Sequence, residues 1–257
     1  MEQVAAAVVD VTKFLAACEA SLQAKKTASL LKTLTVNALI TGEVGVGKRT
    51  LASFILPDAY IIDASNFDEL LLALENSENI IISNLDNSPN VERLIQSIKE
   101  NNVRVIATTK ESYKNQAIEE LFSIRFTIPP LEQRPEDVKI LTEKFIADAS
   151  ILFGDNNFDV SNFEPDLSQN GLSLKRQVMI NYLLQDIQEG ELMDIMQQYF
   201  LKNMGSHSDY RNFLYLYEVP LIKAGLKKCK SQVQLAESLG LNRNTLRKKI
   251  IENKKYL

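Results

Sequence analysis

The sequence predicts an α/β domain with a five-stranded parallel sheet, followed by a helical lid and a small all-α domain. Three observations support this fold class. A glycine-rich loop at residues 42–50 lies between an apolar run and a helical stretch, which is the strand-loop-helix setting of a P-loop. Further β-rich runs then alternate with helical stretches, as in parallel sheets with helical crossovers. Residues 231–250 read as two short helices around a glycine turn.

The expected elements follow the chain in order. The first strand is expected at residues 35–40, directly before the glycine loop, and a helix follows from residue 51. Later strands are expected at 60–63, 80–83, 103–108 and 125–128, with helices at 67–75, 91–100 and 112–122. The predicted divisions are an N-terminal helix (1–30), an α/β subdomain (31–130), a helical lid (131–203) and a terminal helical domain (211–257), with polar residues 204–210 as linker.

Length and composition exclude several classes of protein. With 257 residues and 45% hydrophobic content, the chain can bury a medium-sized core and smaller modules. No apolar run is long enough for a membrane span, and no basic residue precedes the first apolar stretch, so a cytoplasmic protein is expected. Cys18, Cys229 and His207 lie far apart in the sequence, so we expect neither a disulfide nor a metal site.

An apolar stripe marks the predicted N-terminal helix. Its members recur at alternating intervals of four and three residues and are Val4, Val8, Val11, Leu15, Cys18 and Leu22. A stripe this short is typical of a helix that packs on its own domain. Self-association or a partner helix is the alternative.

The glycine-rich loop GEVGVGKRT indicates a phosphate site. Its glycines allow backbone amides to converge on phosphate oxygens, and Lys48 can reach the β- and γ-phosphates. A P-loop carries Ser or Thr after this lysine to hold magnesium, but here the residue is Arg49 and Thr50 comes one position too late. ATP or ADP is the expected ligand, a loop that has lost its nucleotide is the alternative, and the role of magnesium stays open. The predicted nucleotide contacts are Gly42, Glu43, Val44, Gly45, Val46, Gly47, Lys48, Arg49 and Thr50.

Residues 231–250 predict a helix-turn-helix. Leu235, Ala236 and Leu239 share one face of the first helix, and Gly240 suits a left-handed turn position. Asn242 can then cap a second helix that begins at Arg243. Leu246 and Ile250 of that second helix are expected to point inward.

The outward face of the second helix predicts binding to double-stranded DNA. Arg243, Asn244, Arg247 and Lys248 are spaced by three and four residues, so they can enter a major groove together. From residue 223 onward, ten Lys or Arg and two Glu give +8, so the rest of the chain carries −12 to reach the total of −4. A basic end on an acidic body suits phosphate neutralisation, although a merely solvated helix is the alternative. The predicted DNA contacts are Asn242, Arg243, Asn244, Thr245, Arg247, Lys248 and Lys249.

Two sets of motifs carry a resemblance to a known family. The segment GLNRNTLRKK resembles the C-terminal DNA-binding unit of Fis and of NtrC-type regulators. The segments GEVGVGK, NVRVIATT and PPLEQRPEDV resemble the AAA+ module of sigma-54-dependent, NtrC-type activators. This resemblance implies a P-loop AAA+ domain with a helical lid, and it places a second nucleotide sensor at Lys175. An ordinary solvated pair formed by Lys175 and Arg176 is the alternative.

Several positions depart from the family pattern. The Asp-Glu pair that ends the third strand of the family is Ser83 and Asn84 here, and the γ-phosphate sensor is Lys110. One trans-acting arginine corresponds to Ile118, and Arg125 matches the other only approximately. Asp86 could replace the lost carboxylates only if the third strand were shorter than it looks. Because phosphoryl transfer depends on these charges, no catalytic residue is expected and ATPase activity is expected to be lost.

A deletion points the same way. Only 35 residues (83 − 48) separate Lys48 from Ser83, whereas the family carries a sigma-factor-contacting loop in this interval. Contact with sigma-54 is therefore not expected.

These observations predict a DNA-binding transcriptional regulator or nucleoid-associated protein built on a degenerate AAA+ domain. The alternatives are an active sigma-54-type activator and a scaffold protein with vestigial DNA binding. A homodimer is expected through the C-terminal module, and a higher oligomer through the AAA+ domain is a further alternative. The predicted dimer stripe is Phe213, Leu216, Val219, Ile222 and Leu226.

Overall fold

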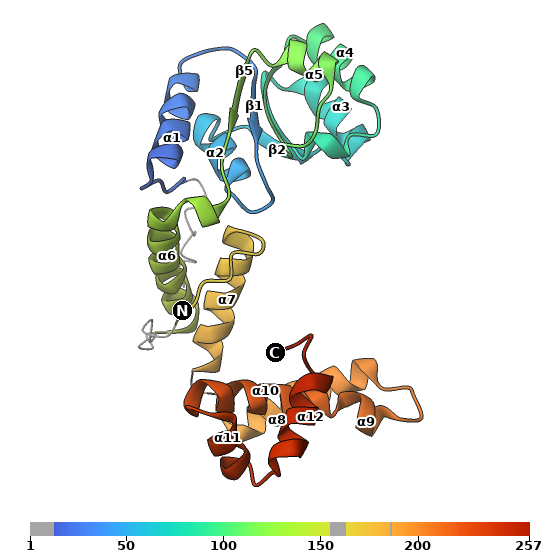
Figure 1. Ribbon diagram of the computed structural model, residues 1–257. Coiled ribbons are helices and arrows are strands. Elements are labelled where there is room, and N and C mark those ends of the chain that lie inside the picture. Colours follow the sequence, from blue (N-terminus) through green and yellow to red (C-terminus); the bar gives the residue numbers. More distant parts are fainter. Residues whose placement is uncertain (1–12, 155–162, 186) are drawn as a thin grey trace, which may run out of the picture. The chain divides into compact units, whose positions relative to one another are not determined.

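The computed structural model describes residues 13–154, 163–185 and 187–257 (Figure 1). It divides into two compact units, of which the first ends at Asp186 and the second spans Ile187–Leu257. The first unit is called the body here and the second the C-terminal module.

The body is built on a five-stranded parallel sheet, as predicted. The strands are β1 (Ala38–Thr41), β2 (Tyr60–Asp63), β3 (Asn79–Ser83), β4 (Arg104–Thr109) and β5 (Ile124–Thr127), in the order β2-β3-β4-β1-β5. The first strand starts later than predicted, because Asn37 accepts a hydrogen bond from the Val105 amide through its side chain before backbone pairing begins. All five strands run parallel, so their carboxyl ends lie at one edge.

Helices cover both faces of this sheet. On one face α1 (Glu19–Leu31) and α2 (Lys48–Ile55) share a core with Ile40, Ile81 and Ile106. On the other face α3 (Phe67–Asn76), α4 (Val91–Glu100) and α5 (Gln116–Leu121) pack on alternate residues of the same strands. Helix α5 begins later than predicted, because the Asn115 side chain caps it by accepting from the Ala117 and Ile118 amides.

The heptad stripe predicted for the N-terminal helix is wrong over its described part. Residues 13–17 are not helical, and α1 begins only at Glu19 with Cys18 as its N-cap. The cause is Asp137, whose carboxylate accepts hydrogen bonds from the Ala17 and Cys18 amides at 2.6 and 3.0 Å. Leu22 is consequently exposed, and the buried face of α1 is Ser21, Ala24, Ala28 and Leu31. Val4, Val8 and Val11 lie outside the described residues.

Two helices form the lid of the body. They are α6 (Pro135–Phe153) and α7 (Gly171–Leu184), which enclose a small core of Leu131, Val138, Phe145, Leu174 and Val178. The Tyr182 hydroxyl donates a hydrogen bond to the Gly154 carbonyl and so fastens the far end of α7 to the end of α6.

The C-terminal module contains five helices in its described residues. They are α8 (Glu189–Asn203), α9 (Asp209–Phe213), α10 (Tyr215–Lys228), α11 (Gln232–Ser238) and α12 (Arg243–Glu252). Helix α8 was expected in the lid, but it belongs to the module, where Phe200 lies 5.2 Å from Phe213 between ring centroids. The expected linker at 204–210 is an ordered turn, because Asp209 accepts from the Gly205 and Ser206 amides. Among the described helices, none has the length and apolar character to cross a membrane.

Candidate functional site

The P-loop connects β1 to α2. Its backbone carbonyls accept hydrogen bonds from Lys48 and from residues of the lid region. Lys48 donates through Nζ to the carbonyls of Gly42 at 2.7 Å and Glu43 at 2.6 Å. The carbonyls of Val44, Gly45 and Val46 accept from groups of the lid region. Because the N–H of a peptide unit points opposite its C=O, the amides of the three residues that follow them point to the inner side of the loop. Backbone amides that point away from the lid contacts of their carbonyls are candidate donors to phosphate oxygens.

The turn that begins α7 provides two of these contacts. The Gly171 amide donates to the Gly45 carbonyl at 3.0 Å, and Asn170 donates through Nδ2 to the Val44 carbonyl at 2.9 Å and to the Glu43 carboxylate at 3.0 Å. Gly45 has a φ of +81°, and a Cβ there would lie 2.1 Å from the Gln169 carbonyl oxygen. Glycine is therefore required at 45 for the loop and the lid to meet. Asn170 also accepts from the buried Leu131 amide at 2.7 Å.

A buried ion pair provides the third contact. Arg134 is 1% exposed and donates through Nη2 to the Val46 carbonyl at 3.1 Å, while its Nη1 lies 3.1 Å from Asp137. Burial lowers the pKa of Arg134, and the Asp137 charge opposes that shift. Asp137 is also fully buried and binds the start of α1. The pair thus joins the P-loop, the lid and α1.

The carboxyl end of β3 holds the two positions at which the resemblance predicts carboxylates, and the end of β2 lies beside it. Ser83 ends β3 and is buried, and Arg49 donates through Nη2 to its hydroxyl at 3.1 Å. Asn84 has a φ of 52° and donates to Asp63 at 2.6 Å. Sequence reasoning missed Asp63, although its place at the end of a parallel strand beside β3 is a usable signal. Burial opposes the shift, but bonds from Ser65 and Asn84 and the Arg49 charge hold the pKa of Asp63 below its ordinary value.

Asp86 lies on the short helix η1 (Leu85–Asn87) directly after β3. Its carboxylate accepts from the Thr109 hydroxyl at 3.1 Å and lies 3.0 Å from the Lys110 ammonium. Burial opposes the shift, but these partners hold the pKa of Asp86 below its ordinary value. Burial lowers the pKa of Lys48, and the charges of Asp86 and Lys110 act on it with opposite sign. Lys48 and the Asp86–Lys110 ion pair are called the charge cluster here, because the charges of the pair act on Lys48.

The remaining predicted positions differ from one another in their surroundings. Ile118 is part of the body core, and Arg125 is paired with Glu119 at 3.1 Å on the surface. Lys175 is exposed on α7, the helix that begins at the P-loop. Thr50 lies within α2 and is half-buried.

Magnesium, which this fold implies for nucleotide hydrolysis, does not fit the residues present. Arg49 stands where the metal-binding hydroxyl belongs and occupies Ser83 with its guanidinium. The two carboxylates of this edge, Asp63 and Asp86, are already bonded to amide, hydroxyl or ammonium groups. Among the described residues there is no group of three or more His, Cys, Asp or Glu that could hold a metal ion.

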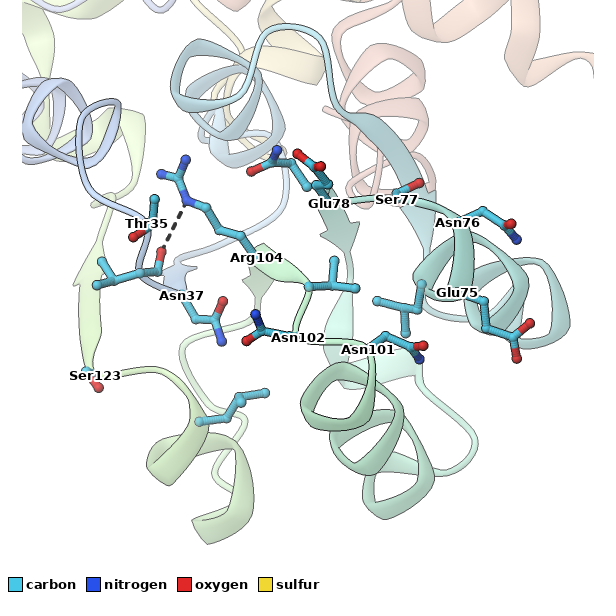
Figure 2. A pocket seen from close by; sticks show the side chains of 15 residues that line it. Thr35, Asn37, Glu75, Asn76, Ser77, Glu78, Asn101, Asn102, Arg104 and Ser123 are labelled. Carbon is cyan, nitrogen blue, oxygen red and sulfur yellow. Dashed lines mark hydrogen bonds between the residues drawn. The ribbon is translucent and has the colours of Figure 1, made fainter.

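A hollow of about 980 Å³ lies at the amino ends of β3 and β4. This is the edge of the sheet opposite the P-loop. Figure 2 shows it ringed by amide and carboxylate side chains, among them Asn37, Asn101 and Glu78. Arg104 donates to the backbone carbonyls of Val36 and Leu31. The cations that suit a phosphate are therefore at the P-loop edge.

The C-terminal module confirms the predicted helix-turn-helix. Gly240 has a φ of +63°, and Asn242 caps α12 by accepting from the Asn244 amide at 2.9 Å. Leu235, Ala236, Leu246 and Ile222 form the buried core. Gly225 of α10 permits this packing, because a Cβ there would lie 2.1 Å from a Leu235 methyl carbon.

The outward face of α12 carries most of the predicted DNA contacts. Asn242, Arg243, Asn244, Thr245, Arg247 and Lys248 are all exposed. Within the described chain no acidic group pairs with Arg243 or Arg247, and Lys248 is 3.8 Å from Glu252 on the surface. Lys249 differs, because it is ion-paired with Glu218 of α10 and its side chain is 27% exposed. It belongs to the internal packing of the module.

The predicted dimer stripe is wrong at two positions. Ile222 and Val219 are buried in the module itself, since α11 and α12 pack onto this side of α10. Leu226 of the predicted stripe is exposed, and the other apolar side chains exposed along α9 and α10 are Tyr210, Leu214, Tyr217 and Leu221.

Comparison with known proteins agrees with both units. Residues 216–252 match the model of the Fis family of bacterial regulatory proteins. None of the curated proteins matches the sequence. The fold is similar to NtrX from Brucella abortus solved with ADP (15% identity, TM-score 0.61), over 94% of this chain and 69% of NtrX. Domain III of the replication initiation protein DnaA from Thermotoga maritima is similar over 74% of this chain and 97% of that domain (15% identity, TM-score 0.52).

The two units therefore have the folds that the sequence motifs predict. The body has five parallel strands with helices on both faces, a P-loop and a helical lid. The C-terminal module carries a glycine turn and a capped second helix within the matched residues. The fold is thus similar to those of NtrX and of DnaA domain III, and residues 216–252 form a helix-turn-helix that matches the Fis family.

Proposed function

We propose that this chain is a DNA-binding transcription regulator, or a nucleoid-associated protein, whose AAA+ body binds ATP or ADP without efficient hydrolysis. The observation that carries the proposal is the exposed face of α12, on which Arg243 and Arg247 have no acidic partner in the described chain. Unpaired arginines on a capped helix of a helix-turn-helix suit bidentate contacts to guanine and contacts to phosphate.

The nucleotide part of the proposal is supported by the backbone of the P-loop. Lid contacts hold its carbonyls outward, which leaves amides for phosphate oxygens. NtrX, whose fold is similar, has been solved in complex with ADP and with ATP. Hydrolysis needs charges that orient water and stabilise the leaving group, and the carboxylates near the P-loop are all engaged by other groups. We infer a bound nucleotide that acts as a structural or sensing ligand.

Contact with sigma-54 is not part of the proposed function. Between β2 and β3 the chain forms the single helix α3 of ten residues. This interval leaves no room for an additional contacting loop. We propose double-stranded DNA as the partner, bound by a homodimer of the C-terminal module, with the protein located on the nucleoid.

Titration of the full-length chain with double-stranded DNA tests this function. The double variant Arg243→Ala/Arg247→Ala should weaken binding by about 1 to 3 kcal/mol for each lost contact and reduce the salt dependence. Lys99→Ala, which removes a cation in the last turn of α4 in the body, is the matched control and should bind as wild type does. Unchanged binding by the double variant would refute the proposed DNA-binding surface and favour a scaffold.

Nucleotide turnover tests the second half of the proposal. The wild-type chain should release phosphate at the background rate with or without DNA. A steady rate on the order of 1 s⁻¹, ordinary for a competent enzyme, would instead favour an active ATP-dependent activator.

A further inference from the structure

We propose that the P-loop of this chain neutralises nucleotide phosphates with Lys48, Arg49 and Lys110 and therefore binds nucleotide without magnesium. This inference rests on the nucleotide-binding function proposed above. It adds the charge chemistry of the site, in which side-chain cations replace the divalent ion.

Arg49 distinguishes this site from an ordinary P-loop, which carries Ser or Thr at the same position. It follows Lys48 at the start of α2 and reaches across to the end of β3, where its Nη2 lies 3.1 Å from the Ser83 hydroxyl. A guanidinium has only donor groups and cannot be deprotonated in proteins. A metal ion placed between α2 and β3 would meet this positive charge, and the nearby carboxylate oxygen, Asp63 Oδ2 at 3.5 Å from the Ser83 hydroxyl, already accepts from Asn84. The same guanidinium can donate to phosphate oxygens in fork geometry.

The carboxylates of the site are already engaged. Asp63 accepts from the Ser65 amide and hydroxyl and from Asn84 Nδ2. Asp86 accepts from the Thr109 hydroxyl and pairs with Lys110. Magnesium demands near-octahedral oxygen ligands and gives up its water reluctantly. It would have to displace at least one of these bonds while Arg49 repels it.

Lys110 brings a further cation to the same place. Its side chain is 56% exposed although its ammonium lies 3.0 Å from Asp86, so it is anchored at one end of the cluster and open to solvent. Its charge acts on the pKa of Lys48, which places the two cations in a shared field. A phosphate group bound at the loop would attract both cations and relieve their mutual repulsion. Lys110 is therefore the third cation that we assign to the phosphate site, beside Lys48 of the loop and Arg49 at the start of α2.

The test is fluorescence titration of the full-length chain with a fluorescent ADP analogue, once with magnesium and once with EDTA. The wild-type chain should bind equally in both buffers, within about threefold in Kd, which corresponds to about 0.7 kcal/mol. Lys110→Ala should weaken binding in both buffers, and Lys99→Ala should change neither value. Circular dichroism checks that each variant is folded.

A reconstruction of the metal site provides the converse experiment. Arg49→Thr together with Ser83→Asp restores a hydroxyl after Lys48 and a carboxylate at the end of β3. This double variant should need magnesium, with binding in EDTA at least about tenfold weaker than with magnesium.

The outcomes separate the inference from the function on which it rests. Wild-type binding that occurs only with magnesium overturns the inference and leaves the proposed nucleotide function intact. Equal binding by the reconstructed variant in both buffers also overturns it, since Arg49 and Ser83 would not then govern the metal requirement. A wild-type chain that binds no nucleotide in either buffer overturns both.

Discussion

The P-loop and helix α12 both carry several cationic side chains, but the bonding partners of these side chains differ. At the P-loop, Lys48 is bonded to two carbonyls, Arg49 to Ser83 and Lys110 to Asp86. On α12, Arg243 and Arg247 have no ion-pair partner in the described chain. The P-loop cations all have bonding partners within the body, whereas the two arginines of α12 are open to an external anion.

This difference indicates what each site can do. A preorganised site with internal partners loses some of its own bonds when a ligand enters, so the bonds gained with the ligand are partly offset by the bonds that are broken. Unpartnered surface arginines gain contacts and release counterions when they meet DNA. We therefore expect each exposed cation of α12 to contribute separately to DNA binding. The nucleotide site should depend instead on the frame of the P-loop, which is the set of contacts that the lid residues make with its carbonyls.

The largest effect is expected where the frame of the P-loop is buried most deeply. Asp137→Asn leaves the charge of Arg134 without its counterion inside the body, which should cost about 3 to 5 kcal/mol of stability. Urea unfolding followed by circular dichroism measures the loss. Glu119→Gln, which breaks an exposed pair with Arg125, is the control and should cost less than about 1 kcal/mol. Equal losses for the two variants would show that the buried pair does not hold the frame.

A smaller effect is expected at the turn that joins the lid to the P-loop. Asn170→Ala removes the acceptor of the buried Leu131 amide and the donor to Val44, so it should cost about 1 to 3 kcal/mol. The matched control is Asn102→Ala, because Asn102 has a similar positive φ of 51° but is exposed. Their difference in urea midpoint measures the side-chain bonds alone. If both variants lose the same stability, only the backbone conformation matters at position 170.

In helix α12, the N-cap residue allows the effect of helix geometry on DNA binding to be measured apart from the effect of charge. Asn242→Ala removes the bond to the Asn244 amide and should destabilise the helix by about 1 kcal/mol. DNA affinity should fall, but its dependence on salt should stay the same because no cation is lost. Asn242→Ser keeps a capping oxygen and should restore affinity. A changed salt slope in Asn242→Ala would contradict this separation.

The smallest effect is expected from acid titration of the charge cluster. The pKa of Asp86 lies below its ordinary value in the folded chain, so its contribution is complete above the unfolded pKa of about 4 and is lost as the pH falls through the folded pKa. The urea midpoint of wild type should therefore drop more between about pH 5 and pH 3 than that of Asp86→Asn. Identical profiles would mean that the bonds of Asp86 to Lys110 and Thr109 do not favour its charged form.

Local chemistry made α12 predictable from the sequence. Gly240, Asn242 and Arg243 lie close together in the chain, and the turn and the cap need only neighbouring residues. The parallel strands were equally accessible, because apolar runs alternate with helical stretches around the glycine-rich loop. The roles of Asp63 and Asn170 were not, because they depend on partners 21 and 126 residues away. The start of α1 was missed for the same reason, since Asp137 competes for the backbone amides of Ala17 and Cys18.

The link between Asp137 and the start of α1 also has a consequence for the order of synthesis. The two bonded groups are separated by 120 residues, and a ribosome adds about 5 to 20 residues each second. The segment before α1 must therefore wait for seconds until α6 has been made. The sheet can pair up to β5 during this interval, because its strands all precede residue 128. The first described segment to leave the ribosome is thus among the last parts of the body to be fixed in place.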